Sequence, residues 1–135
     1  AFSDPDYYLS AETVAEAVRS GRLFNIIHSH TGAKVDVIPL TADPFTQAAF
    51  ARRRRLPYDR DGRSAWLISL EDMIIAKLRA WRETGSEKHL RDACGILLLQ
   101  PNAIDLEAVR RNARALGLES ILDDLLRSCT GQAPH

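Results

Sequence analysis

The chain has 135 residues, 45% of them apolar and 27% charged, and its 18 basic and 18 acidic residues cancel to a net charge of zero. This composition is that of one ordinary globular protein with enough apolar residues for a core, and it excludes a long disordered tail and a protein that is basic overall. No apolar run approaches the roughly 20 residues of a membrane span, so we expect no membrane association.

Two small counts bear on the origin of the chain. Met73 is the only methionine, so Ala1 is not an initiator residue, and the first residues lack the basic start and apolar centre of a signal peptide. We therefore expect a chain truncated at its N-terminus. Cys94 and Cys129 show neither C-x-x-C nor zinc spacing, which predicts two free thiols in a reducing, cytoplasmic compartment.

The first elements are one helix and one hairpin. Residues 1–9 are predicted to be irregular, and Ser10 is a typical N-cap for a helix over 11–20 that ends at Gly21. Residues 23–40 have the pattern of a β-hairpin. Its strands are expected at 23–28 and 34–38, and its turn at 30–33.

A second helix and a third strand follow. Asp43 and Pro44 suit the cap and the first position of a helix. This helix is predicted to end in the arginine run, Arg52 to Arg55. Pro57 and the turn residues after it break the chain before a short strand over 64–68.

From Ser69 onward the pattern is helical. Ser69 followed by Asp72 is a variant of the capping box, and Asp105 suits the cap of a later helix. Four helices are expected, over 70–82, 87–99, 106–116 and 119–128. The predicted fold is therefore α+β, with a small mixed or antiparallel sheet containing a hairpin in residues 1–68 and a helical bundle in residues 69–130.

Asp36 is the most informative residue of the first part. It interrupts an otherwise apolar strand, where acids are depleted, and burying it without a partner would cost several kcal/mol. It must therefore face solvent, a partner cation or a metal. It is either an acid on the solvated face of an antiparallel sheet or a ligand of a divalent cation. His28 and His30 could join it in a zinc-like site, the alternative being a polar turn and one half-buried histidine.

Charged residues also interrupt the apolar helix faces of the second part. Lys77 lies in the apolar run 73–78, where it either extends its ammonium to the surface or places it in a polar site. Asp92 could reach Lys77 across two helices, as a structural salt bridge or as an active-site pair. Arg91 is adjacent to Asp92, and adjacent residues of a helix do not face each other.

The arginine run is the one basic patch. Residues 51–63 hold six arginines against Asp59 and Asp61, a local charge of +4. Arg52 and Arg53 are candidate substrate-binding residues that could contact phosphates. The alternative is a solvated helix end, placed favourably at the negative end of the helix dipole.

The order of these motifs resembles a known family. The run Phe24 to His28 is followed by T-G-A-K-V-D-V over 31–37, by L-E-D at 70–72 with Lys77, and by R-D at 91–92. This order resembles the minimal nucleotidyltransferase fold, the polymerase-beta-like superfamily. More narrowly, it is similar to bacterial nucleotidyltransferase-like proteins related to abortive-infection toxins, over about residues 7–127.

The resemblance implies roles for single residues. Asp36 matches a strand carboxylate that helps to hold Mg²⁺, and Lys77 matches a helix lysine that contacts nucleotide phosphates. Asp92 matches an acid that fixes this lysine or acts as a base. Arg91 completes the R-D motif and is, like Lys77, a candidate substrate-binding residue. The implied activity is transfer of a nucleoside monophosphate from an NTP to RNA or protein, with Mg²⁺ as cofactor, as in the toxin of a toxin–antitoxin pair.

Two motifs of that family are absent from the chain. Upstream of Asp36 there is no Gly-Ser pair, which would bind the triphosphate, followed by a strand with the D-x-D pair that supplies two metal ligands. Gly85 and Ser86 lie downstream in a break between helices, and Asp4 and Asp6 precede no predicted strand. We therefore expect the fragment to be inactive alone and to self-associate through an exposed sheet edge. The alternatives are a non-catalytic binding or regulatory module with the same fold, and a small metal-dependent hydrolase that uses His28, His30 and Asp36.

Overall fold

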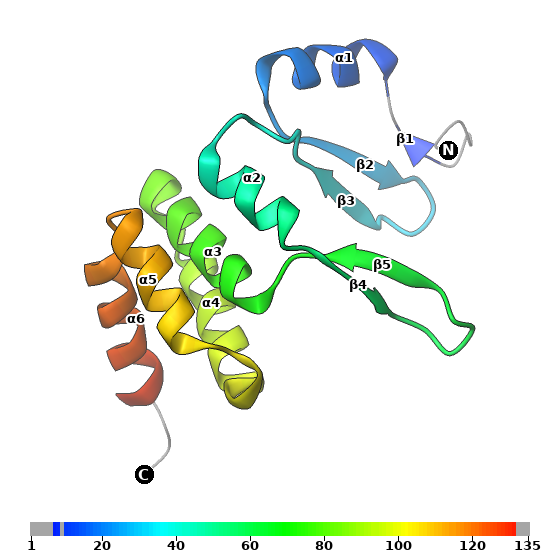
Figure 1. The fold of residues 1–135 in the computed structure, drawn as a ribbon. Coiled ribbons are helices and arrows are strands. Elements are labelled where there is room, and N and C mark those ends of the chain that lie inside the picture. Colours follow the sequence, from blue (N-terminus) through cyan, green and yellow to red (C-terminus); the bar gives the residue numbers. More distant parts are fainter. Residues whose placement is uncertain (1–6, 9, 132–135) are drawn as a thin grey trace. The chain divides into compact units, whose positions relative to one another are not determined.

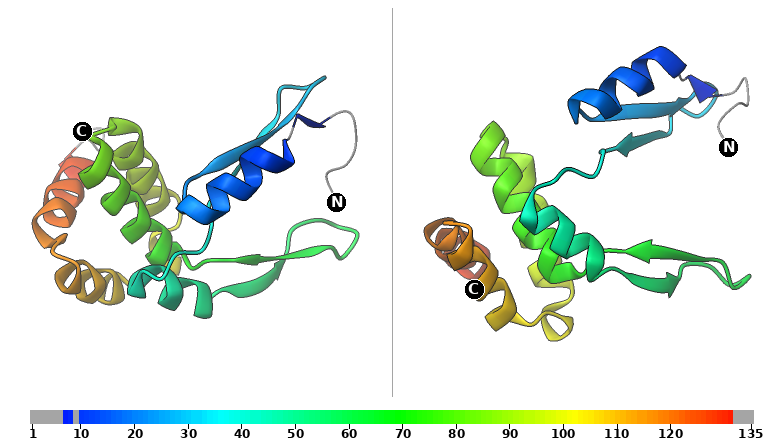
Figure 2. Two further views of the ribbon diagram at one scale, coloured as in Figure 1. Left: turned by 90° about the horizontal axis from the view of Figure 1, so that it is seen from above. Right: turned by 45° about the horizontal axis from the view of Figure 1, so that its top comes forward.

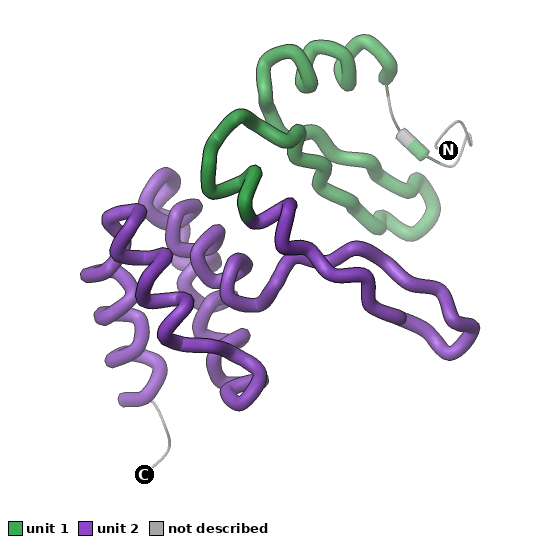
Figure 3. Tube along the Cα trace, viewed as in Figure 1, with its two compact units in different colours: residues 1–48 green, residues 49–135 purple. Residues whose placement is uncertain are grey.

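The computed structural model describes residues 7, 8 and 10–131. They form an α+β protein, as predicted, with short antiparallel strands before a set of helices (Figure 1). The chain divides into two compact units, residues 1–48 and 49–135 (Figure 3).

The first unit is a three-stranded antiparallel sheet with one helix. Its elements are β1 (Tyr7–Tyr8), α1 (Ala11–Ser20), β2 (Phe24–His28) and β3 (Lys34–Val37). The strand order is β1-β2-β3, so β2 is central. In the register of the predicted hairpin, Phe24 lies opposite Val37 and Ile27 lies opposite Lys34.

Local signals explain α1. Ser10 Oγ accepts a hydrogen bond from the Thr13 N–H at 3.4 Å, and Gly21 ends the helix in the left-handed conformation, with a φ of 68°. Glycine adopts this conformation without a steric penalty. Ala17 of α1 and Ile26 of β2 are buried where the helix packs against the sheet.

Strand β1 corrects the prediction that residues 1–9 are irregular. Tyr7 pairs with His28, and Tyr8 pairs with Ile27. A strand of two residues has no alternation to detect in a sequence, because only its pairing defines it. Residues 1–6 and 9, which the same prediction covered, lie outside the described residues.

The arginine run forms part of a strand, which corrects the prediction that it ends a helix. Helix α2 (Pro44–Ala51) stops before the run, and Arg54 and Arg55 belong to β4 (Arg54–Pro57), which pairs with β5 (Ser64–Leu67). Pro57 supplies a physical reason, because a proline restricts the residue before it to extended conformations.

The boundary between the two units also differs from the predicted one. It lies inside α2, after residue 48, and not after residue 68. The β4–β5 hairpin therefore belongs with the helices. The ion pair between Arg52, just before β4, and Asp72 of the first following helix ties the hairpin to them.

Four helices form the rest of the second unit (Figure 2). They are α3 (Leu70–Thr84), α4 (Glu87–Leu99), α5 (Leu106–Ala115) and α6 (Glu119–Gly131), with a 3₁₀ turn at Pro101–Ala103. Helices α3 and α6 each pack against both α4 and α5. The fully buried apolar residues are Ile74, Ile75, Leu78, Ala93, Val109, Ala113, Leu118 and Leu122. Burial of each large aliphatic side chain contributes about 1.5–3 kcal/mol. In the described part of the chain, no helix has the length and apolar composition needed to cross a membrane.

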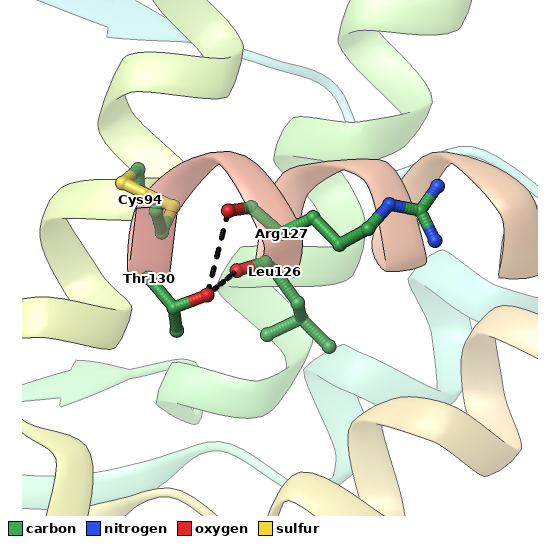
Figure 4. Close-up of a disulfide and its surroundings, with 5 residues drawn as sticks. Cys94, Leu126, Arg127 and Thr130 are labelled. Atoms are coloured by element: carbon green, nitrogen blue, oxygen red, sulfur yellow. Dashed lines mark hydrogen bonds between the residues drawn. A yellow bond between two sulfur atoms is a disulfide. The ribbon is translucent and has the colours of Figure 1, made fainter. Parts of the chain in front are cut away.

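A disulfide joins Cys94 of α4 to Cys129 of α6, which corrects the prediction of two free thiols (Figure 4). Packing of the two helices brings their Cα atoms to 5.8 Å, a separation that a disulfide can span. The pairing joins positions 35 residues apart, so it depends on helix packing and not on local spacing. Beside it, Thr130 Oγ1 donates a hydrogen bond to the Leu126 carbonyl at 2.7 Å (Figure 4).

Candidate functional site

Lys77 and Asp92 meet where α3 packs against α4. Lys77 Nζ donates a hydrogen bond to Asp92 Oδ2 at 2.9 Å, and the two side chains are 28% and 37% exposed. The neighbouring Ile74 and Leu78 of α3 are fully buried, so Lys77 extends from the edge of the core to a surface-accessible position. The ion pair that the sequence suggested is therefore present in the structure.

This arrangement leaves binding capacity on Lys77. An ammonium has three N–H donors, and Asp92 takes one of them. Among the described residues, Asp92 is the only ion-pair partner of Lys77. The partly exposed ammonium can therefore also bind an anionic oxygen, while Asp92 limits its movement.

The charges around Asp92 favour its ionised form. The hydrogen bond from Lys77 is the largest cause that lowers the pKa of Asp92 below its ordinary value of 3.8, and partial desolvation opposes it. The charges of Lys77, Lys88 and His89 lower this pKa further. A carboxylate with a lowered pKa is a weak proton acceptor, so Asp92 is better suited to positioning Lys77 than to acting as a base.

His89 is a residue of this region that sequence reasoning missed. Its Nδ1 is buried and has no hydrogen-bond partner among the described residues. It precedes Asp92 by three positions on α4, a spacing that places both on one side of the helix. The three-residue spacing between His89 and Asp92 was the sequence signal that could have identified His89.

Arg91 does not join the pair. It lines a depression of about 320 Å³ with Trp81 and the two cysteines of the disulfide. Among the described residues it has no ion-pair partner. The R-D motif is thus divided between two surroundings, as expected for adjacent residues of a helix.

Asp36 lies on β3 in the first unit, opposite Asn25 of β2. Asn25 Nδ2 donates a hydrogen bond to Asp36 Oδ1 at 3.0 Å, and Lys34 Nζ is 3.7 Å from the same oxygen. The Asp36 side chain is 45% exposed. The carboxylate therefore faces solvent and a cation, two of the three surroundings that its position in the sequence allowed.

The hairpin register separates Asp36 from the two histidines. Asp36 lies opposite Asn25, three residues before His28, a distance of about 10 Å along the strand and on the opposite face. His28 Nδ1 accepts a hydrogen bond from the Thr31 N–H at 3.2 Å within the turn, and the rings of His28 and His30 are 5.8 Å apart. The hairpin does not assemble the zinc-like constellation.

The two candidate arginines have different surroundings. Arg52 donates hydrogen bonds of 3.0 and 2.7 Å to the fully buried Asp72, and this bonding raises the pKa of the guanidinium. Arg53 instead lies over the rings of Phe50 and Trp66. Sequence reasoning missed these two aromatic residues, although their position beside the arginine run was a usable signal.

The resemblance implies one Mg²⁺ ligand in this chain, Asp36. No three His, Cys, Asp or Glu side chains gather anywhere in the part of the chain that the structure describes. Asp36 is one carboxylate beside an amide and an ammonium, whereas hard cations need several oxygen ligands. The comparisons with protein-family models, curated proteins and solved structures found no match to this chain.

Proposed function

We propose that the chain is the lysine-bearing part of a nucleotidyltransferase that transfers a nucleoside monophosphate from an NTP to RNA or protein. The observation that carries this proposal is the Lys77–Asp92 pair, at 2.9 Å and with Lys77 28% exposed. A lysine ammonium binds phosphate as a point charge, and its affinity for a ligand benefits when the side chain is already held in place.

Asp36 has a separate role in this proposal. It would supply one oxygen to a Mg²⁺ ion whose remaining ligands lie outside the described residues. Because a single carboxylate binds Mg²⁺ weakly, the chain alone should transfer no nucleotide. Incorporation of label from an NTP into RNA or protein by this chain alone would contradict that expectation.

One observation favours a non-catalytic module as the second candidate. Each of the two acids in the proposal already has a lysine partner within its own unit, Asp36 with Lys34 at 3.7 Å and Asp92 with Lys77 at 2.9 Å. Such self-contained pairs suit a module that binds a nucleotide and performs no chemistry on it.

A titration of the ¹⁵N-labelled chain with Mg-ATP, followed by NMR, tests the nucleotide site. We expect the largest shift changes around Lys77 and Asp92, and we expect Lys77→Met to abolish them. Arg111→Met is the control, because it removes a positive charge from an exposed side chain of α5 that forms no ion pair among the described residues. The proposal would be refuted if Mg-ATP caused equal chemical-shift changes in Lys77→Met and in the parent chain. It would also be refuted if the parent chain showed no shift changes near Lys77.

The magnesium dependence separates the two candidates. If Asp36 is a metal ligand, the NMR signals around Asp36 should change when Mg²⁺ is removed, and Asp36→Asn should lose this response. A binding module predicts no such response in either chain. The titration is therefore repeated with and without Mg²⁺ on both chains.

A further inference from the structure

The β4–β5 hairpin has a face that the proposed nucleotide site does not use. Arg55 lies opposite Trp66, and Pro57 lies opposite Ser64. Residues directly opposite each other share one face of a hairpin. Arg53 precedes β4 and lies beside this face, because its guanidinium is over the Trp66 ring. We define the Arg–Trp face as Phe50, Arg53, Arg55, Ser64 and Trp66.

Contacts hold the charged groups of the Arg–Trp face in place. The Arg53 guanidinium lies 3.9 Å from the ring centroid of Phe50 and 4.9 Å from that of Trp66, within the range of cation–π attraction. Arg55 Nε donates a hydrogen bond to Ser64 Oγ at 2.6 Å. Both rings are nevertheless accessible, since Trp66 is 59% exposed and Phe50 is 44% exposed.

Acids of the second unit neutralise only part of the positive charge. Residues 51–63 carry six arginines and two aspartates, a balance of +4. Both Asp59 and Asp61 pair with Arg63, and Arg52 pairs with Asp72. Four arginines have no carboxylate partner among the described residues: Arg53, Arg54, Arg55 and Arg60.

We infer that the Arg–Trp face binds single-stranded RNA. An unstacked base can lie on the exposed indole of Trp66, because every base has a π-face, while Arg53 and Arg55 attract the backbone phosphates. A duplex keeps its bases stacked and so cannot use the indole. An acidic protein would use the charge of the arginines but not the stacking surface. The choice of RNA rests on the proposed function, in which RNA is an acceptor.

Fluorescence anisotropy with a labelled oligouridine and the whole chain tests this inference. We expect Trp66→Ala to weaken binding by about 5-fold to about 150-fold, the effect of losing one stacked base. Trp66→Phe should keep most of the affinity, because it keeps a ring. Arg55→Gln should lower the slope of log Kd against log salt by about 0.7, the value for one phosphate contact.

Arg19→Gln is the matched control. It removes the same charge from an exposed arginine at the end of α1, outside the hairpin, and should leave the salt slope unchanged. If Trp66→Ala unfolds the protein, Trp66→Phe and Arg55→Gln still carry the test. Absence of saturable binding by the parent chain at low salt, or equal affinity in Trp66→Ala, would overturn the inference.

Competition experiments exclude other kinds of partner. The labelled oligouridine is displaced with unlabelled oligouridine, duplex RNA or polyglutamate. If duplex RNA or polyglutamate competes as strongly as unlabelled oligouridine, the inference is also overturned, because the indole then contributes nothing to binding. Lys77→Met should leave RNA binding intact. If the chain binds RNA but shows no Lys77-dependent binding of Mg-ATP, the proposed transferase is refuted and the RNA-binding surface stands. If it binds Mg-ATP through Lys77 but does not bind RNA, the RNA-binding surface is refuted and the proposed transferase stands.

Discussion

Removing Arg52 should destabilise the second unit more than removing its partner Asp72. The Asp72 side chain is fully buried, whereas the Arg52 side chain is 49% exposed. In Arg52→Met the carboxylate stays buried without a counter-charge, which we expect to cost about 3–5 kcal/mol. In Asp72→Asn the half-exposed guanidinium can turn to water, so the expected cost is that of the lost charge-assisted hydrogen bonds, about 1.5–3 kcal/mol.

The double variant sharpens this prediction. Arg52→Met/Asp72→Asn contains no buried charge, so it should be at least as stable as Arg52→Met alone. Urea unfolding followed by tryptophan fluorescence measures the free energy of unfolding, because Trp66 and Trp81 both lie in the second unit. The reasoning would be refuted if Asp72→Asn lowered the free energy of unfolding more than Arg52→Met does. It would also be refuted if the double variant were less stable than Arg52→Met.

Arg111→Met provides the control for removing an arginine. Arg111 is an exposed residue of α5 in the same unit and has no ion-pair partner among the described residues. Its replacement should change the free energy of unfolding by no more than about 0.5 kcal/mol, as is usual for a surface position. A loss as large as that of Arg52→Met would show that any missing arginine destabilises the unit.

Two further predictions concern the helices. Reduction of the Cys94–Cys129 disulfide should lower the free energy of unfolding by about 4 kcal/mol, because the bond closes a loop across 35 positions. The double variant Cys94→Ala/Cys129→Ala should unfold at the same urea concentration as the reduced parent protein, with or without reductant. A parent protein whose urea midpoint does not change on reduction would contradict this prediction. The pKa of Asp92 is lowered, so its pair with Lys77 stabilises the fold fully above the ordinary pKa of 3.8. This contribution is lost as the pH falls through the lower pKa of the folded state. NMR titration should find a higher Asp92 midpoint in Lys77→Met, and equal midpoints would contradict the assignment.

The helices were predictable because their limits depend on neighbouring residues. Ser69 Oγ accepts a hydrogen bond from the Asp72 N–H at 3.1 Å, and Asp105 Oδ1 accepts one from the Ala108 N–H at 3.1 Å. Both caps were recognisable, since a cap needs only a short polar side chain three positions before the N–H that it satisfies. The α+β class follows from the same local patterns.

Strand β4 was not predictable in this way. Arginine is a good helix former, so the run from Arg52 to Arg55 continued the preceding helical pattern. Pairing of β4 with β5, together with Pro57, overrides that preference. The Arg–Trp face appears only when this register places Arg55 opposite Trp66.

The sequence by itself determined the limits of the capped helices, the first hairpin and the residue types of the candidate site, but not the end of α2. Only the tertiary structure decided which of those residues meet. It joined Lys77 to Asp92 across α3 and α4, bound Arg52 to Asp72 and bonded Cys94 to Cys129. These contacts depend on how helices and strands pack, and spacing along the chain does not specify the distance between residues on different elements.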